Sequence, residues 1–563
     1  MTYVVTQPCC NDASCVAVCP VNCIHPTPDE SDYARTEMLY IDPNTCIDCG
    51  ACADACPIDA IVPDSDLDEG DMPYLEINAD YFEDPKNRNY PGVAAVQRHP
   101  VVGVTGATPL RVAIVGTGPA ACYAGEELLA SGATGVEVHF FERLPTPWGL
   151  VRFGVAPDHQ QTKSVSEAFS RIGSRRGAYF HLNVEIGKHL THEELLTHFH
   201  AVIYAVGAHD DRRLGIAGED LPGSYSASDF VSWYNGHPDG AQRSFDLSGT
   251  RAVVVGNGNV ALDVARMLST DVKSLARTDI ADHALTALAG SAISEVVVLG
   301  RRGPAQAAYT TPELLGLAAA EGIDLVVDSV GAESIGVATT TAEPSGMSAA
   351  VDFKSRLFDE IAAAPTTGAP KRIVLRFLSS PIEILGDDRV RGLRVQRNEL
   401  VETTEGEFVV RPTDQFDDIE CGLVIRSIGY RGTPLAGLPF DDKTGTVPNE
   451  KGRVFDPITG EAVAGVYVAG WIKRGPSGSI GNNSRCARDT VRALVEDYSE
   501  GRLTAPALDN DALTQLVSQR QSNALTYTDW KTIDQFERSA ARKHNRPRIK
   551  LVDIDSMLGV ARP

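Results

Sequence analysis

The sequence predicts an α/β fold with two parallel-sheet domains, preceded by a small α+β domain. Two features predict this arrangement. An apolar, strand-like run leads into a glycine-rich turn and a helical pattern twice, at Gly116 and again at Gly256. Nine of the 12 cysteines lie within the first 56 residues, which separates a short N-terminal unit from the rest of the 563-residue chain. At roughly 150 residues per domain, this length suits three to four compact units.

The charge distribution also sets the N-terminal unit apart. The chain has 51 basic and 75 acidic residues, a net charge of −24, and residues 1–108 alone hold 18 acidic and 4 basic residues. A field of this sign repels nucleic acid phosphates, so we expect no nucleic acid partner. No run of 18 apolar residues could span a bilayer, and the start of the chain does not resemble a secretory signal. We therefore expect a cytoplasmic protein without a membrane span.

The cysteine spacing at the end of this unit is typical of iron–sulfur ligation. Cys46, Cys49, Cys52 and Cys56, followed by Pro57, form the run C-x2-C-x2-C-x3-C-P, which bacterial ferredoxins use to bind clusters. Zinc sites normally show separated pairs of cysteines. In a long chain without a signal peptide, clustered cysteines also favour ligation over a disulfide framework.

A shift of 37 residues superimposes this run on an earlier one and reveals an internal duplication. The shift places Cys9 on Cys46, Cys15 on Cys52 and Cys19 on Cys56. In two-cluster modules the fourth cysteine of each run binds the cluster of the other run. One predicted cluster, a 4Fe-4S centre, therefore takes four thiolates, from Cys19, Cys46, Cys49 and Cys52.

The other predicted cluster has only three thiolates, from Cys9, Cys15 and Cys56. Asp12 stands where the shift expects the partner of Cys49. Three thiolates favour a 3Fe-4S cluster, and a 4Fe-4S cluster with Asp12 as its fourth ligand is the alternative.

Residues 1–75 resemble the seven-iron ferredoxins, with a loop at residues 26–38 that is longer than in the simplest members. Under the same shift Cys10 and Cys23 fall on apolar residues, so we expect both to be packing residues. Residues 63–108 are rich in Asp, Pro and Gly, and we expect residues 76–108 to form a linker.

The first glycine-rich turn follows a predicted strand at residues 111–115. Gly116, Gly118 and Ala121 allow a tight turn and the close approach of a pyrophosphate to a helix N-terminus. The next predicted strand ends at Glu142, 26 residues after Gly116, whose carboxylate could accept hydrogen bonds from a ribose. This is the pattern of a Rossmann-like dinucleotide site.

The second turn follows a predicted strand at residues 251–255 and favours NADPH over NADH. It contains five candidate cofactor-binding residues: Gly256, Gly258, Asn259, Val260 and Ala261. The next predicted strand ends not in an acid but in Arg301 and Arg302, whose guanidinium groups can clamp a 2′-phosphate. The alternative is that this arginine pair is a solvated strand end.

The identity of the first dinucleotide follows from the other sites. NADPH gives up two electrons as a hydride, whereas an iron–sulfur cluster accepts one electron at a time. A flavin is needed between them, so we expect FAD at the first turn.

Four motifs resemble the adrenodoxin reductase-type NADPH–ferredoxin reductases. They lie at residues 144–159, 256–266, 301–304 and 470–478. With the cysteine-rich unit in front, the whole chain resembles the actinobacterial ferredoxin/ferredoxin–NADP reductase fusions. The resemblance implies an FAD domain at residues 109–209 and 426–563 that is split by an NADP domain at residues 210–425. The chain would cross between them after the apolar strands at 201–207 and 422–429.

The resemblance also implies particular site residues. Leu150, Gly470, Trp471 and Gly478 are expected to contact the flavin. For Trp471 the alternative is core packing. His159 and Glu313 map near the flavin and the nicotinamide, as candidate catalytic residues that tune flavin protonation or orient the nicotinamide. From the sequence alone, a purely structural role for His159 and a surface position for Glu313 are equally good interpretations.

The predicted function is that of an NADPH–ferredoxin oxidoreductase. A hydride passes from NADPH to FAD, and single electrons pass to the fused iron–sulfur module and on to an external acceptor, such as a haem monooxygenase or another ferredoxin. The alternatives are a glutamate synthase-type electron-input subunit and a non-catalytic redox sensor. Two basic segments, Arg171 to Arg176 and Arg542 to Lys550, could dock the acidic module, although solvated helix surface is the better interpretation of both.

Overall fold

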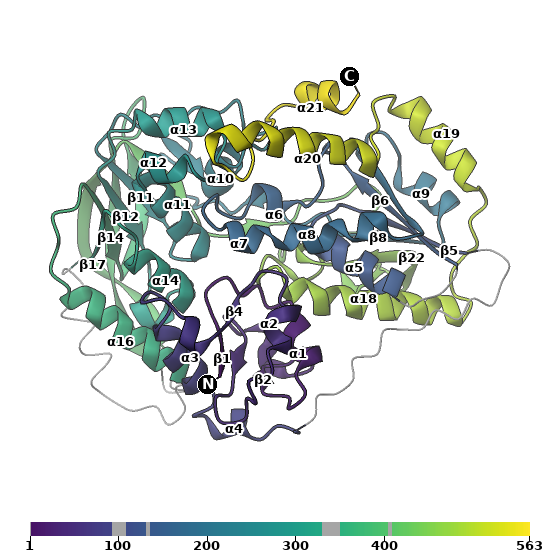
Figure 1. Cartoon of the computed structure of the whole chain (residues 1–563). Helices are drawn as coiled ribbons and strands as arrows, with labels where there is room; N and C mark the ends of the chain where they lie inside the picture. Colours follow the sequence, from purple (N-terminus) through teal and green to yellow (C-terminus); the bar gives the residue numbers. More distant parts are fainter. Residues whose placement is uncertain (1, 93–108, 131–134, 329–348, 404–407, 563) are drawn as a thin grey trace.

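The computed structural model describes residues 2–92, 109–130, 135–328, 349–403 and 408–562. Figure 1 shows two larger α/β units side by side, with the small N-terminal unit, in purple, seated below their junction. The C-terminal helices, in yellow, lie along the opposite side of the same junction.

The N-terminal unit is built on the internal duplication. Strands β1 (Tyr3–Val5) and β4 (Ile61–Pro63) pair antiparallel, as do β2 (Ile24–His25) and β3 (Tyr40–Ile41). Helix α1 (Ser14–Val18) lies 37 residues before helix α2 (Ala51–Ala55), and the two helices are in contact. The residues before them, Ala13 and Gly50, both have positive φ, at 62° and 75°. The predicted repeat is therefore a repeat of backbone conformation as well as of cysteine spacing.

The N-terminal unit continues beyond the predicted boundary at residue 75. Helix α3 (Pro73–Tyr81) packs against β1 and β3, and helix α4 (Pro85–Arg88) follows it. The buried Asn78 side chain accepts from the backbone of Val5 and Ile41, and Tyr90 donates to Asp42 at 2.6 Å. The start of the predicted linker is therefore wrong, because these aromatic and amide side chains complete the core of the unit. Residues 93–108 lie outside the described part of the chain.

The first large unit is a seven-stranded sheet in the order β20-β21-β22-β8-β5-β6-β7. Strand β5 is buried along its whole length, as expected for a central strand of a parallel sheet covered on both faces. The strands come from two separate segments of the chain: β5 (Leu110–Val115), β6 (Val136–Glu142), β7 (Ala178–Leu182), β8 (Ala201–Tyr204), β20 (Asn449–Glu450), β21 (Arg453–Phe455) and β22 (Ala462–Val468). The helices of this unit are α5 (Pro119–Ala130), α6 (Leu150–Phe153), α7 (Gln160–Lys163), α8 (Val165–Ser170), α9 (His192–His198), α17 (Trp471–Arg474) and α18 (Asn482–Ser499).

The second large unit is a six-stranded parallel sheet in the order β10-β18-β11-β12-β14-β13. Its strands are β10 (Ser224–Ser226), β11 (Arg251–Val255), β12 (Glu295–Leu299), β13 (Ile323–Val327), β14 (Lys371–Arg376) and β18 (Leu423–Arg426). Its helices are α10 (Ala227–Tyr234), α11 (Asn259–Ser269), α12 (Val272–Leu275), α13 (Asp282–Ala289), α14 (Thr311–Ala318) and α16 (Ala349–Ala363). An antiparallel sheet of β15 (Ser379–Leu385), β16 (Gly392–Glu402) and β17 (Phe408–Glu420) extends from it.

The chain crosses between the two large units through a short ribbon. Strands β9 (Asp210–Asp211) and β19 (Tyr430–Arg431) pair antiparallel, so the outgoing and returning segments run side by side. Helices α19 (Asn510–Arg520), α20 (Tyr527–Ala541) and α21 (Ile554–Ala561) then close the molecule.

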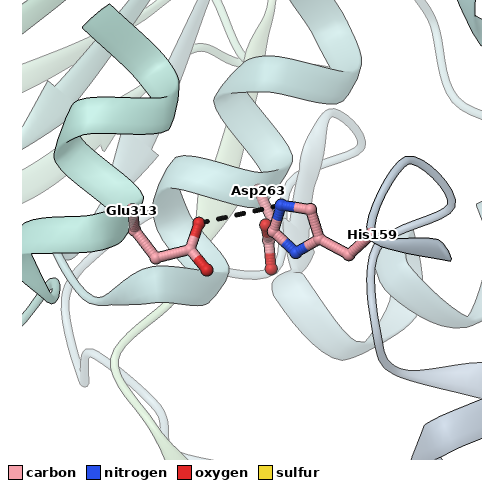
Figure 2. A group of neighbouring side chains, drawn as sticks. All are labelled: His159, Asp263 and Glu313. Carbon is pink, nitrogen blue, oxygen red and sulfur yellow. Dashed lines mark ion pairs between the residues drawn. The ribbon is translucent and has the colours of Figure 1, made fainter. Parts of the chain in front are cut away.

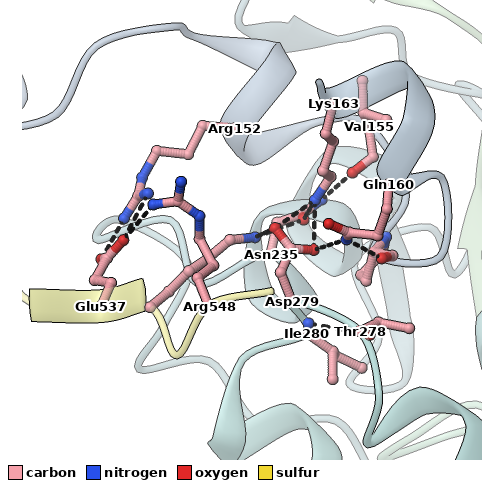
Figure 3. A network of polar contacts seen from close by, with 12 residues as sticks. Arg152, Val155, Gln160, Lys163, Asn235, Thr278, Asp279, Ile280, Glu537 and Arg548 are labelled. Carbon is pink, nitrogen blue, oxygen red and sulfur yellow. Dashed lines mark hydrogen bonds and ion pairs between the residues drawn. The ribbon is translucent and has the colours of Figure 1, made fainter. Parts of the chain in front are cut away.

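Buried ion pairs hold the C-terminal segment against both large units (Figure 3). Lys550 pairs with Asp279 of the six-stranded unit at 2.9 Å. Glu537 of α20 accepts from Arg152 of the seven-stranded unit at 2.6 Å and from Arg548 at 2.7 Å. Since buried charges are tolerated only when they are paired, these contacts define one relative position of the two units.

The helices of the described residues include none that is long and apolar enough to cross a membrane.

Candidate functional site

The first glycine-rich turn lies at the carboxyl end of β5 and leaves room for a ligand to approach the protein backbone. Gly116 has φ of 101°, and a Cβ there would lie 2.6 Å from the Ala205 carbonyl oxygen, so only glycine fits. A Cβ at Gly118 would meet no atom within 4 Å. Ala121 lies in the first turn of helix α5, which begins directly after Gly118, and a pyrophosphate there would meet free backbone N–H groups.

Glu142 ends the neighbouring strand β6 and is held in place by local bonds. Its carboxylate accepts from the Thr117 hydroxyl at 2.6 Å and from the Leu144 N–H at 3.1 Å. Burial raises the pKa of Glu142. The nearby Thr146 hydroxyl is buried and has no hydrogen-bond partner among the described residues, which suits a site that a polar ligand completes.

The Gly-Trp segment from the C-terminal part of the chain lies beside this turn. Gly470 has φ of 76°, and a Cβ there would lie 2.6 Å from the Cβ of Ala120 at the start of α5. Trp471 is half-buried, stacks on Tyr430 with ring centres 5.6 Å apart, and donates from Nε1 to the Ser477 carbonyl at 3.2 Å. It is therefore not a core residue.

Two further residues are expected to contact the flavin. Gly478 follows the Gly-Trp segment, and Leu150 lies at the start of α6. Gly478 has φ of 81°, and a Cβ there would lie 2.8 Å from the Asn482 side chain. Leu150 begins α6 and is exposed by 44%. A large apolar side chain that stays exposed beside the turn is available to a ligand.

The second turn has the same construction in the six-stranded unit. Gly256 has φ of 117°, and a Cβ there would lie 2.0 Å from the Ser427 carbonyl oxygen. Helix α11 begins at Asn259, directly after Gly258 and just before Val260 and Ala261. Arg301 and Arg302 follow β12, and both are exposed. Neither side chain makes an ion pair within the described part of the chain, so both remain available to an anionic ligand.

His159, Asp263 and Glu313 meet at the junction of the two large units (Figure 2). They come from the turn before α7, from α11 and from α14. His159 Nε2 lies 3.9 Å from a Glu313 carboxylate oxygen. The two predicted catalytic residues, 154 positions apart in the sequence, are therefore neighbours.

Arg266 organises this cluster. Its guanidinium donates to Asp158 at 2.6 Å and to Asp263 at 2.8 Å, lies 2.9 Å from His159 Nε2 and lies 3.6 Å from Glu313. One ligand atom from each of His159, Asp263 and Glu313 lies within 4.8 Å of the others, a spacing that a metal ion could use. The arginine already supplies the positive charge at this position, so we interpret the group as an ion-pair cluster.

The cluster also controls the protonation of its members. Burial raises the pKa of Glu313, and the Asp263 charge raises it further. Burial alone would raise the pKa of Asp158, but the Arg266 charge outweighs it and lowers that pKa. Sequence reasoning missed Asp158, Asp263 and Arg266, although the spacing of Asp263 and Arg266 on one helix face is a usable signal.

Five thiols of the N-terminal unit line a single cavity. Four of them, Cys19, Cys46, Cys49 and Cys52, are the predicted ligands of the first cluster. Burial raises the pKa of Cys52 to about 12, so its thiolate is stable at neutral pH only beside a cation such as iron. Cys23 lines the same cavity, with its Sγ 3.5 Å from that of Cys19, which the duplication did not indicate.

The other three predicted ligands gather on the side of the unit that faces the seven-stranded sheet. Burial, together with the nearby Cys56 and Asp12, raises the pKa of Cys9 to about 12. Cys15 is buried and has the same neighbours. The Asp12 carboxylate accepts from the Ser14 N–H at 3.4 Å and from the Ser14 hydroxyl.

This second thiol group lies next to the seven-stranded unit. Cys9 and Cys56 pack against the apolar core of that unit, and Cys10 is buried within it. The Cys10 carbonyl accepts from the Gly481 N–H at 2.6 Å and from the Ser479 hydroxyl at 2.9 Å. A Cβ at Gly481 would lie 2.1 Å from the Asn11 backbone, so only glycine permits this approach.

The docking contacts differ from the two basic segments considered from the sequence. Arg175 pairs with Glu126, and Arg546 and Arg548 pair with Asp282 and Glu537, all outside the N-terminal unit. The unit is held instead by backbone and amide contacts near Gly481 and by residues of α14 and α16. The sequence could not show this, because each donor lies far along the chain from the residue of the N-terminal unit that it contacts.

Comparisons with known proteins agree with this geometry. Residues 39–62 match the family described as a 4Fe-4S binding domain. A probable ferredoxin/ferredoxin–NADP reductase of Mycobacterium tuberculosis is 51% identical over all of this chain and 95% of its own length. The chain belongs to the ferredoxin/ferredoxin–NADP reductases. A second such protein, from Mycobacterium leprae, is 48% identical over 100% of this chain and 98% of its own length.

The reductase portion also matches a solved structure without the fused module. The structure of Mycobacterium tuberculosis FprA in complex with NADPH has a TM-score of 0.75 and 44% sequence identity, and it covers 80% of this reductase and 99% of its own chain. The two-domain dinucleotide-binding fold predicted from the sequence is confirmed by this similarity, and the ferredoxin–NADP reductase family is confirmed by the full-length relatives.

Proposed function

We propose that this reductase oxidises NADPH and delivers the electrons singly to its own iron–sulfur module and then to an external redox protein. The observation that carries the proposal is the docking of the thiol-rich unit on the FAD-type unit through the Cys10–Gly481 contact at 2.6 Å. This contact places the predicted ligands Cys9 and Cys56 against the core of that unit. Electron transfer can then occur within one folded chain.

FAD is assigned to the first glycine turn because the residues there fit it. Gly116 and Gly118 leave the backbone open, and the Thr146 hydroxyl, which has no partner among the described residues, offers a buried polar group. When bound, FAD would accept the two electrons of a hydride together and release them one at a time. In this proposal the Glu142 carboxylate binds the FAD ribose, and the half-buried Trp471 side chain forms one side of the flavin site.

NADPH is assigned to the second turn, with Arg301 and Arg302 holding the 2′-phosphate. His159 and Glu313 then act at the nicotinamide side of the junction. Hydride transfer requires no protein acid or base, but it requires a fixed orientation and the exclusion of water. The Arg266 cluster supplies the fixed orientation, because Arg266 contacts both His159 of the seven-stranded unit and Glu313 of the six-stranded unit.

The cluster types follow from the number of thiols. Four thiols, from Cys19 and from the run Cys46 to Cys52, suit a 4Fe-4S cluster, and three thiols with Asp12 nearby suit a 3Fe-4S cluster. The external acceptor is a redox protein such as a haem monooxygenase or another ferredoxin. A module of this acidity favours a partner with a basic face.

An anaerobic titration with NADPH, followed by visible absorbance and electron paramagnetic resonance together, tests the proposal. We expect flavin bleaching and cluster reduction to occur in the same titration, and NADH to act more slowly than NADPH. Purified protein that holds zinc in place of iron, or that has no flavin absorbance, would contradict it.

A further inference from the structure

Glu37 of the N-terminal module makes a direct contact with a helix of the NADP unit. It lies at the end of the long loop at residues 26–38, just before β3. One carboxylate oxygen accepts from the Thr311 N–H, at the first residue of α14, at 2.7 Å. The Thr310 side chain, at the usual capping position, makes no capping bond within the part of the chain that the structure describes. The acceptor for this helix end therefore comes from a different module.

A lysine of the NADP unit secures the same contact. Lys354 of α16 lies 3.5 Å from the other Glu37 oxygen, and its side chain is only 10% exposed. It donates to the Ala307 carbonyl at 3.2 Å and to the Tyr309 carbonyl, and it lies over the Tyr309 ring at 4.8 Å. Glu37 and Lys354 together hold the loop that leads into α14.

The helix end that Glu37 holds carries residues of the nucleotide site. Glu313 is two positions after Thr311, in the same first turn, and lies 3.9 Å from His159. On the other side, the Thr310 N–H donates to the side chain of Asn259 at 2.8 Å, and Asn259 begins the helix of the second glycine turn. The contact therefore lies between the iron–sulfur module and both parts of the NADPH site.

We propose that Glu37 is a positioning residue through which the docked ferredoxin module orders the nicotinamide side of the NADPH site. The inference rests on the proposed placement of the nicotinamide beside His159 and Glu313. The adenosine side depends on Arg301 and Arg302, which begin the same connection between β12 and α14 but are held separately from it, because their backbone carbonyls accept from Asn398 at 3.0 Å and from Leu378 at 3.2 Å. Loss of the Glu37 contact should therefore affect the nicotinamide half of the ligand and leave the adenosine half unchanged.

The test uses the full-length protein with its cofactors and compares Glu37→Ala and Glu37→Gln with the parent. The control is Glu69→Gln, because Glu69 is an exposed acid of the same module. The ligands are NADP⁺ and 2′,5′-ADP, which lacks the nicotinamide, and each dissociation constant is measured by calorimetry. The rate of flavin bleaching by NADPH is measured by stopped flow.

We expect Glu37→Ala to weaken NADP⁺ binding by about tenfold, since a charge-assisted hydrogen bond is lost, and to slow flavin bleaching. The affinity for 2′,5′-ADP should not change. Glu37→Gln keeps an oxygen acceptor but loses the pair with Lys354, so its effect should be smaller. Glu69→Gln should match the parent in every measurement.

Two results would overturn the inference. One is a Glu37→Ala protein that matches the parent in NADP⁺ affinity and in bleaching rate. The other is an equal loss of affinity for NADP⁺ and 2′,5′-ADP, which would show a general loosening of the NADP unit. If NADPH does not bleach the flavin of the parent protein, that result contradicts the proposed function. The difference between the affinities for NADP⁺ and 2′,5′-ADP would still test the role of Glu37.

Discussion

Lys163 of the seven-stranded unit and Asp279 of the six-stranded unit form a buried ion pair, with Nζ 2.7 Å and 2.9 Å from the two carboxylate oxygens. Lys550 contacts the same carboxylate, and Asn235 accepts from both lysines. The Asp279 carboxylate is therefore the counter-charge of both buried lysines. Burial alone would raise the pKa of Asp279, but the charges of Lys163 and Lys550 lower it far below its ordinary value.

The first prediction concerns this carboxylate. Asp279→Asn leaves two buried ammonium groups without a counter-charge, and we expect it to lower the free energy of unfolding by about 3–5 kcal/mol. Urea denaturation measures the change. Asp220→Asn is the control, because Asp220 is 81% exposed and pairs with Arg213 at the surface. A loss no larger than that of the control would show that the pair does not contribute to stability.

The arginine pair after β12 gives the second prediction. The double variant Arg301→Ala, Arg302→Ala should raise the KM for NADPH by about 10- to 100-fold, because charge-assisted bonds to the 2′-phosphate are lost. The KM for NADH should remain nearly unchanged. Steady-state kinetics with both coenzymes measure the effect. Equal losses for both would contradict the assignment of the 2′-phosphate.

The third prediction concerns the missing cysteine of the duplicated run. Asp12→Cys should convert the three-thiol site into a second four-iron site, raising the iron content from about seven to about eight per FAD. Iron analysis and electron paramagnetic resonance measure the change. Asp12→Ala is the matched variant, and it should keep the parent iron content if the site holds three irons. An unchanged spectrum for Asp12→Cys would contradict the 37-residue alignment.

A buried histidine gives the fourth prediction, on pH dependence. Burial, together with the nearby His181 and Arg111, lowers the pKa of His139 to about 2. Its Nε2 is buried without a hydrogen-bond partner in the described structure. Because the folded pKa lies below the unfolded value of about 6.5, the neutral ring stabilises the fold above pH 6.5. That contribution is lost as the pH falls, by about 1.4 kcal/mol per pH unit.

Urea denaturation at pH 7 and pH 5 tests this sign. His139→Phe keeps an aromatic ring stacked on Tyr179 and edge-on to Phe199, and it should make the stability less dependent on pH in this range. His544→Gln, at an exposed site, is the matched variant. A variant at residue 139 that keeps the full pH dependence would show that other groups cause it.

The parts of the site that the sequence predicted are those whose chemistry is local. Cys46 to Cys52 lie within seven residues, and Gly116 and Gly118 lie within three, so spacing alone indicates a cluster and a pyrophosphate turn. In the structure the duplication also extends to the matching helices that begin at Ser14 and Ala51. The boundary at residue 75 was wrong because Asn78 and Tyr90 act through distant partners, which composition does not show.

The sequence by itself determined the two glycine turns, the thiol runs and the basic pair at Arg301, because each is a set of neighbouring residues with one chemical use. Only the tertiary structure decided that Arg266 gathers His159 and Glu313, that Gly481 receives the module and that Glu37 holds α14. The physical reason is that a buried charge or backbone N–H takes whichever partner the packed units bring within hydrogen-bond distance. Glu37 and Thr311 are 274 residues apart, and no periodicity in the sequence relates them.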